Sequence, residues 1–226
     1  MSLVVAFWGR DYQLWCSDGM TVARAAVGLK LVSSLTAKIV KHPCHNLLHG
    51  WSGDKFDGET IISKIVEHSI DGSTAEYLES VGEFCNMVNR LSEDYSLRRH
   101  ETPSGTGMIV GGYVGDSGFL AVVSPSGDIF KQKRYAVIGY KTEEAASVMH
   151  EYADPDLSVS DAYEMMLGCF DRVRLSTRYV NDMIFPFVVT PNTFNDMSSL
   201  TLSHRTSRTD RTRAHQREIA KITTRQ

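Results

Sequence analysis

The order in which helices and strands follow one another constrains the fold of this chain more than any other feature of its sequence. Apolar residues recur at helical spacing over residues 55–71 and 74–91, and again over 143–152 and after Ser158, so the helices come in consecutive pairs. Short apolar segments bounded by Gly, Asp, Ser or Pro lie before, between and after these pairs. A doubly wound parallel sheet alternates one strand with one helix, so this order disfavours it. The sequence predicts an α+β fold in which helix pairs cover antiparallel sheets.

The expected strands start at the second residue of the chain. Pro186 lies inside the last of them, which predicts an edge position or a bulge. Ser158 is the expected N-cap of the last helix. Each of three helices has an expected buried face, made by Phe56, Ile61, Ile62, Ile65 and Val66, by Tyr77, Val81, Phe84, Cys85 and Val88, and by Ala162, Met165, Cys169 and Val173. The expected strands are residues 2–8, 12–17, 37–41, 45–50, 107–113, 118–124, 134–139 and 183–190.

Length and charge predict one domain with a basic arm. The chain has 226 residues and a net charge of −3, which argues against a general affinity for nucleic acid. From His204 onward, seven Lys/Arg stand against two acidic residues. We expect a domain over residues 1–195 and a Ser/Thr/Arg-rich arm over 196–226. The arm lacks interleaved aromatic residues, so docking on acidic protein neighbours is favoured over binding nucleic acid.

Cysteines and the N-terminus indicate a reducing compartment. Cys16, Cys44, Cys85 and Cys169 form no C-x-x-C pair, and three of them lie in apolar runs, as expected for buried reduced thiols. The first residues lack the basic segment of a signal peptide, and the chain has no apolar stretch of membrane-spanning length. We therefore expect a protein of the cytoplasm and nucleus.

Four potential metal ligands, His42, Cys44, His45 and His49, lie close together in the sequence. A zinc site needs four converging ligands, whereas strand alternation places His45 and His49 on one face and Cys44 on the other. We expect no metal and no cofactor.

Several segments, in their order along residues 2–190, resemble the proteasome β-type family of Ntn hydrolases. Gly9-Arg10-Asp11-Tyr12 with Cys16-Ser17-Asp18 resembles its opening hairpin, and Lys38-Ile39-Val40-Lys41 its lysine strand. Gly50-Trp51-Ser52-Gly53-Asp54 resembles the glycine-aspartate segment before its first helix. Further resemblances are Gly111-Gly112-Tyr113, Val123-Ser124-Pro125-Ser126-Gly127, Ile138-Gly139 and the link from Tyr152 to Ser158. The resemblance implies a four-layer αββα sandwich of two antiparallel sheets.

The resemblance also implies what an active site would contain. Active members use an N-terminal threonine whose hydroxyl attacks and whose amine acts as base. Loss of Met1 would place Ser2 there. Asp18 would then match the acid that holds the lysine, Lys38 the lysine, and Gly50 the backbone N–H that stabilises the oxyanion.

Two departures from the family pattern predict that this site does not work. Active members carry a Ser-Gly-Ser run where this chain has Tyr140-Lys141-Thr142, and an Asp and a Ser in the loop that here reads 177–182, with Val180 at the serine position. Gly139-Tyr140 and the Asp11-Tyr12 turn resemble the non-catalytic subunit at the fourth β position of eukaryotic proteasomes.

The main hypothesis is therefore a structural subunit with no catalytic residues. It would lie in stacked seven-membered rings with α- and β-type partners around a chamber for unfolded, ubiquitin-marked chains. The alternatives are an active N-terminal-serine hydrolase that uses Ser2, Asp18, Lys38 and Gly50 in a self-compartmentalising protease, and a binding protein that reuses the fold outside any proteasome.

Overall fold

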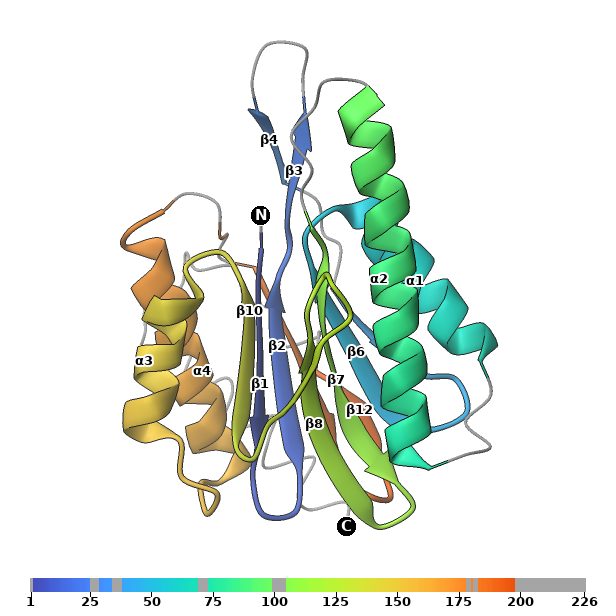
Figure 1. The fold of residues 1–226 in the computed structure, drawn as a ribbon. Helices are drawn as coiled ribbons and strands as arrows, with labels where there is room; N and C mark the ends of the chain where they lie inside the picture. Colours follow the sequence, from blue (N-terminus) through green and yellow to red (C-terminus); the bar gives the residue numbers. More distant parts are fainter. Residues whose placement is uncertain are drawn as a thin grey trace.

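The computed structural model of the chain describes residues 2–24, 29–33, 38–68, 73–98, 105–177, 180 and 183–197. Two five-stranded antiparallel sheets lie face to face, and a pair of helices covers the outer face of each (Figure 1). The predicted four-layer αββα sandwich is confirmed. No helix in the described ranges is both long and apolar enough to cross a membrane.

The first sheet has the order β10-β1-β2-β11-β12, so β1 and β2, the first hairpin in the chain, lie inside the sheet. Its outer face packs on α3 and α4. The elements of this half are β1 (Leu3–Trp8), β2 (Gln13–Asp18), β10 (Tyr135–Gly139), β11 (Ile184–Val189), β12 (Phe194–Asp196), α3 (Thr142–Tyr152) and α4 (Val159–Arg174).

The second sheet has the order β5-β6-β7-β8-β9 and packs on α1 and α2. A separate two-stranded hairpin, β3 (Met20–Arg24) and β4 (Leu29–Ser33), extends beyond the sandwich in Figure 1. The elements of this half are β5 (Ile39–Lys41), β6 (Asn46–Ser52), β7 (Gly107–Val114), β8 (Ser117–Val123), β9 (Ile129–Lys131), α1 (Lys55–Glu67) and α2 (Thr74–Arg98).

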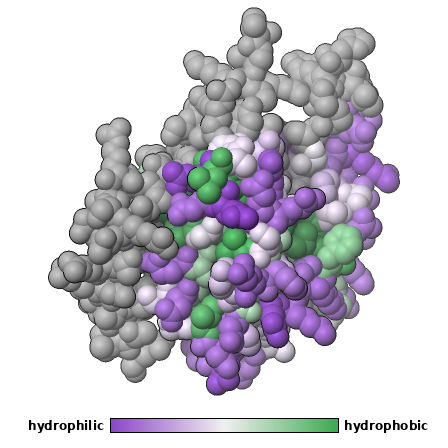
Figure 2. Space-filling model, turned by 90° about the vertical axis from the view of Figure 1, so that its left-hand side faces the viewer, coloured by the Kyte–Doolittle hydropathy of each residue, from purple (hydrophilic) through white to green (hydrophobic). Residues whose placement is uncertain are grey.

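Strand alternation explains why the strands read as unbroken apolar runs. Along β1, Leu3, Val5 and Phe7 join the core under α3 and α4, whereas Val4 and Ala6 join the core between the sheets. A strand between two buried faces needs apolar residues at every position, because successive side chains point to opposite faces. The outer surface on the side of α3 and α4, which faces the viewer in Figure 2, is mainly hydrophilic with isolated hydrophobic side chains.

The helix faces agree with the spacing of the apolar residues, with one correction. The predicted faces of α2 and α4 are buried or partly buried, and Ser158 caps α4 by accepting a hydrogen bond from the Asp161 N–H. On α1, Ile61, Ile62 and Ile65 are buried, but Phe56 is 75% exposed. Asp54 caps α1, so Phe56 lies in the first turn, before the helix meets the sheet.

The prediction for Pro186 was wrong. β11 pairs with β2 on one side and with β12 on the other, so it is not an edge strand. The Pro186 carbonyl accepts a hydrogen bond from the Met197 N–H. Because the nitrogen and carbonyl of one residue point to the same side of an antiparallel strand, the Pro186 nitrogen faces away from β2. It lies beside Met197, the residue after the end of β12. The missing N–H therefore removes no ladder bond to β2.

Other boundaries also shift. α2 continues to Arg98, beyond the end expected near residue 91, and β3, β4, β9 and β12 were not predicted. The domain boundary after residue 195 stays a prediction. β12 and the buried Met197 continue the described body slightly beyond it, and the part of the basic arm after residue 197 lies outside the described residues.

His49 is a titratable group inside the second half of the molecule. Its side chain is fully buried, and its Nε2 shares a hydrogen bond with the Tyr77 hydroxyl of α2. Burial, reinforced by the nearby His42, lowers the pKa of His49 from 6.5 to about 3. The folded protein therefore holds His49 neutral at mildly acid pH, where the unfolded chain takes up a proton.

We expect acid to destabilise the protein through His49. Between pH 6.5 and about 3 the unfolded chain binds one proton more at this residue, so the free energy of unfolding falls as the pH falls. The contribution is about 2 kcal/mol at pH 5. Urea titrations at pH 7 and pH 5 measure it, and His49→Gln, which retains a polar partner for Tyr77, is expected to lose this part of the pH dependence. An equal loss of stability in both proteins would contradict the prediction.

Candidate active site

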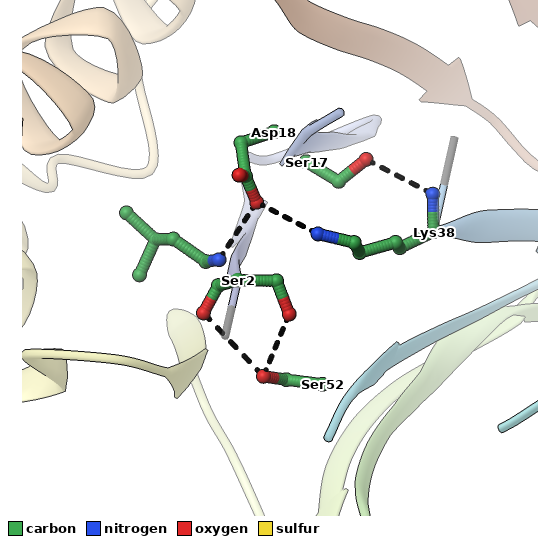
Figure 3. A network of polar contacts seen from close by, with 6 residues as sticks. Ser2, Ser17, Asp18, Lys38 and Ser52 are labelled. Carbon is green, nitrogen blue, oxygen red and sulfur yellow. Dashed lines mark hydrogen bonds and ion pairs between the residues drawn. The ribbon is translucent and has the colours of Figure 1, made fainter. Parts of the chain in front are cut away.

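Four strand ends from the two sheets meet at one end of the sandwich. Ser2 directly precedes β1, and Asp18 ends β2. The two strands are antiparallel with Val4 opposite Ser17, so the start of one lies beside the end of the other. Lys38 directly precedes β5 and Ser52 ends β6, and both strands belong to the second sheet. Figure 3 shows Ser2 between the Asp18–Lys38 pair and Ser52.

A buried ion pair joins the two sheets at this point. The Lys38 Nζ lies 3.2 Å from Asp18 Oδ1, with 9% and 0% of the two side chains exposed. The same carboxylate oxygen accepts from the Leu3 N–H at 2.9 Å. Burial lowers the pKa of Lys38, and the charge and hydrogen bond of Asp18 oppose part of that shift. Lys38 therefore gives up a proton more readily than a lysine in water.

The Ser2 hydroxyl is fixed from the opposite side. Ser2 Oγ lies 2.9 Å from Ser52 Oγ, and the Ser52 hydroxyl also lies 3.4 Å from the Ser2 carbonyl oxygen, to which it can donate. The Tyr140 N–H donates to the same carbonyl at 2.8 Å. Ser2 is 2% exposed. Hydrogen bonds thus hold both the backbone carbonyl and the side chain of Ser2.

Gly139 lets the turn after β10 approach Ser2. It has φ +120°, and a Cβ there would collide with the Ser2 carbonyl oxygen. Only glycine satisfies both constraints without strain. On the other side of the site, the Lys38 N–H donates to Ser17 Oγ at 3.3 Å, which ties the start of β5 to β2.

Gly50 lies within the β6 ladder. It pairs with Ile39 of β5 and with Ile109 of β7. The Trp51 N–H donates to the Lys38 carbonyl on the β5 side, so alternation turns the Gly50 N–H toward β7. The oxyanion role implied for Gly50 stays a prediction, and this register does not favour it.

Three of the four alternative site residues come together, namely Ser2, Asp18 and Lys38. Sequence reasoning missed the contact roles of Ser17, Ser52 and Gly139, although each lies in a segment that carried the family resemblance. Of the loop over 177–182, residues 178, 179, 181 and 182 lie outside the described residues. Val180 is 3% exposed and packs in the core under α3 and α4.

The histidine cluster takes a different form from the one expected. β6 begins at Asn46, so His45 lies before the strand, and its ring is 5.1 Å from that of His42. The ring of His42 lies 5.8 Å from that of His49. Within the described ranges, no group of three or more His, Cys, Asp or Glu side chains is placed to hold a metal ion. Cys16, Cys85 and Cys169 are buried and Cys44 is exposed, all as free thiols.

The arrangement can perform nucleophilic chemistry once Ser2 carries a free amine. A hydroxyl and an amine on one residue supply a nucleophile and its base, and a lysine of lowered pKa lies beside them. The burial of Ser2, Asp18 and Lys38 strengthens each of these interactions. No metal is needed for such a reaction.

We expect the ion pair to behave as one unit in stability measurements. Lys38→Met leaves the Asp18 carboxylate buried without its cation, which should lower the free energy of unfolding by about 3–5 kcal/mol. Adding Asp18→Asn removes that charge and should restore part of the loss. Urea titration of both single variants and of the double variant, at one protein concentration, gives the coupling.

Lys55→Met provides the matched control. Lys55 forms an exposed ion pair with Glu59 at 3.5 Å, and its loss should change stability by less than about 1 kcal/mol. Additive effects of the two substitutions in the buried pair would show that Asp18 and Lys38 do not depend on each other.

Comparisons with known proteins agree with this fold. The model of the family described as proteasome subunit matches residues 5–183. A search of curated proteins found no match. Solved structures of Anbu proteins are similar in fold. A Gly-1 mutant from Hyphomicrobium sp. strain MC1 has 14% identity and a TM-score of 0.71, covering 99% of this chain and 97% of its own.

Two further Anbu structures give the same picture. Anbu from Yersinia bercovieri, described as an ancestral beta-subunit, has 13% identity and a TM-score of 0.71, covering 99% of this chain and 97% of its own. The helical assembly of the Anbu complex from Pseudomonas aeruginosa has 14% identity and a TM-score of 0.72, covering 99% and 96%. At these identities the likeness concerns the fold. The family match spans most of the chain, and the chain belongs to the proteasome subunit family.

Proposed function

We propose that this chain is a proteasome-type β subunit that hydrolyses peptide bonds with Ser2 as an N-terminal nucleophile. The buried Asp18–Lys38 pair beside Ser2 carries the proposal. A buried cation costs free energy, and groups whose pKa is shifted by burial and a specific charged partner are concentrated at functional sites; burial lowers the pKa of Lys38. Unfolded polypeptide is the substrate class that the family resemblance implies.

The reaction follows from the groups present. Ser2 Oγ attacks the carbonyl carbon of the peptide while its proton passes to the α-amine of the same residue. The resulting intermediate collapses, the C–N bond breaks, and the departing amine takes that proton. Water then cleaves the Ser2 ester, with the α-amine again accepting and returning the proton. The charge of Lys38 favours the ionised nucleophile during attack.

This chemistry requires cleavage of the bond between Met1 and Ser2. Before cleavage, the Ser2 nitrogen is an amide and cannot act as a base. The proposal therefore includes a processed N-terminus as a condition.

A structural subunit without activity is the second candidate. Two observations favour it: Ser2 is only 2% exposed, and the turn after β10 reaches Ser2 through the Tyr140 backbone N–H. Active family members carry serine in that turn. Such a subunit would contribute walls and contacts to an assembly and would not react.

The finer expectations about the assembly stay predictions. The fourth β position of a eukaryotic proteasome, seven-membered rings with α-type partners, ubiquitin-marked substrates and a place in cytoplasm and nucleus have no support from the similar structures. Those are Anbu proteins of Hyphomicrobium, Yersinia and Pseudomonas, and one of them is described as a helical assembly.

Covalent labelling tests the proposed activity. A peptide epoxyketone reacts with a hydroxyl and an amine on one residue, so we expect one adduct per chain, mapped to Ser2 by mass spectrometry. Intact mass first establishes that Met1 is absent. Ser2→Ala, which retains the amine, should form no adduct. An unlabelled protein with a free N-terminal serine would reject catalysis and favour the structural subunit.

Native mass tests the assembly. Phe56, Leu91 and Leu175 are 75%, 64% and 87% exposed, and family subunits function in oligomers, so we expect a particle many times larger than the 25.2 kDa chain. Light scattering measures the mass, and electron microscopy separates closed rings from open helices. A stable monomer at micromolar concentration would contradict the prediction.

A further inference from the structure

Ser52 contacts the proposed nucleophile, although neither the expected site nor the reaction above assigns it a role. Its hydroxyl lies 2.9 Å from Ser2 Oγ and 3.4 Å from the Ser2 carbonyl oxygen. It can donate to the carbonyl while it accepts from the Ser2 hydroxyl. Figure 3 shows both contacts converging on the one oxygen of Ser52.

The fold holds Ser52 firmly on both sides. Before it, β6 lies between β5 and β7, with Ser52 opposite Gly107. After it comes Gly53 at φ +138°, where a Cβ would collide with Thr106. The next residue, Asp54, donates its N–H to Thr106 Oγ1 at 3.0 Å and caps α1. Ser52 therefore belongs to a rigid strand end and not to a mobile loop.

We propose that Ser52 is a positioning residue that sets the rotamer of Ser2. The proposal rests on the proposed function, because it assigns a second residue to the same reaction. A serine side chain has three staggered rotamers, and a hydroxyl bound to one partner selects one of them. Because the same partner also faces the carbonyl of Ser2, it fixes the side chain relative to its own backbone. Ser2 Oγ is then held in one position, facing Ser52, before substrate arrives (Figure 3).

The position of Ser52 also suits it for this task without adding charge. Ser52 is half-buried, whereas the charged groups of the site, Asp18 and Lys38, lie on the other side of Ser2 (Figure 3). A neutral hydroxyl orients the nucleophile and leaves the pKa of Lys38 to be set by burial and Asp18. Loss of Ser52 should therefore reduce the rate of reaction and not the binding of the peptide.

The rate of labelling by the peptide epoxyketone tests this role. We expect Ser52→Ala to lower the maximal rate of inactivation about 10-fold, with the half-saturating concentration unchanged, because misplaced nucleophiles react more slowly. Ser52→Thr retains the hydroxyl and should stay within about threefold of the wild type. Ser63→Ala, at an exposed position of α1, is the matched control and should have no effect. Equal rates in Ser52→Ala and wild type would overturn the proposal.

Crystal structures of the unreacted wild type and of Ser52→Ala give a readout that needs no activity. We expect one Ser2 rotamer bonded to Ser52 in the wild type, and several in the variant. An unchanged single rotamer in the variant, or a wild type without the Ser2–Ser52 bond, would overturn the role of Ser52. Failure of the wild type to label would reject the proposed hydrolysis, and the rotamers would still decide the positioning role.

Discussion

Face-to-face packing of the two sheets is the interaction on which the rest of the structure depends. Trp15 from the first sheet and Leu48 and Ile109 from the second are fully buried between them. This core brings the strand ends of both sheets to one edge, where Asp18 and Lys38 form a buried ion pair. Gln13 adds a polar link, because its Nε2 donates to the Phe119 carbonyl of the facing sheet at 2.8 Å. The face-to-face packing of the two sheets thus determines where the site forms.

The layer order could be predicted because helices and strands differ in the period of their apolar residues. The faces of α2 and α4 followed from spacing alone, since burial on one side leaves a clear stripe. Local signals failed where tertiary context decides. Phe56 fits the α1 period but lies in the first turn, and Pro186 is tolerated because the ladder toward β12 ends beside it. Short strands such as β9 and β12 carry too few residues to show a pattern.

The site was predictable only where residues carried a family pattern. Ser2, Asp18 and Lys38 are far apart in the sequence, and no periodicity connects them. Their meeting depends on strand pairing between β1 and β2 and on the packing of the sheets. Ser52 carried no signal of its own, because a lone serine at a strand end has many ordinary roles. Its contact with Ser2 needs coordinates, as does the direction of the Gly50 N–H, which depends on a register that the sequence does not specify.

Stability alone does not explain why this chain keeps an ion pair in its interior. Replacing a buried pair by apolar side chains of similar volume is often neutral or stabilising, because two desolvated charges recover little more than they lose. The Leu3 N–H needs an acceptor, but a neutral side chain at position 18 could supply one. A lysine in this place adds a cation with a lowered pKa near Ser2, and a nearby cation has a use in acyl transfer. The free-energy cost of burying the ion pair has a functional reason if Ser2 reacts. It has no comparable reason if the chain is only a structural subunit.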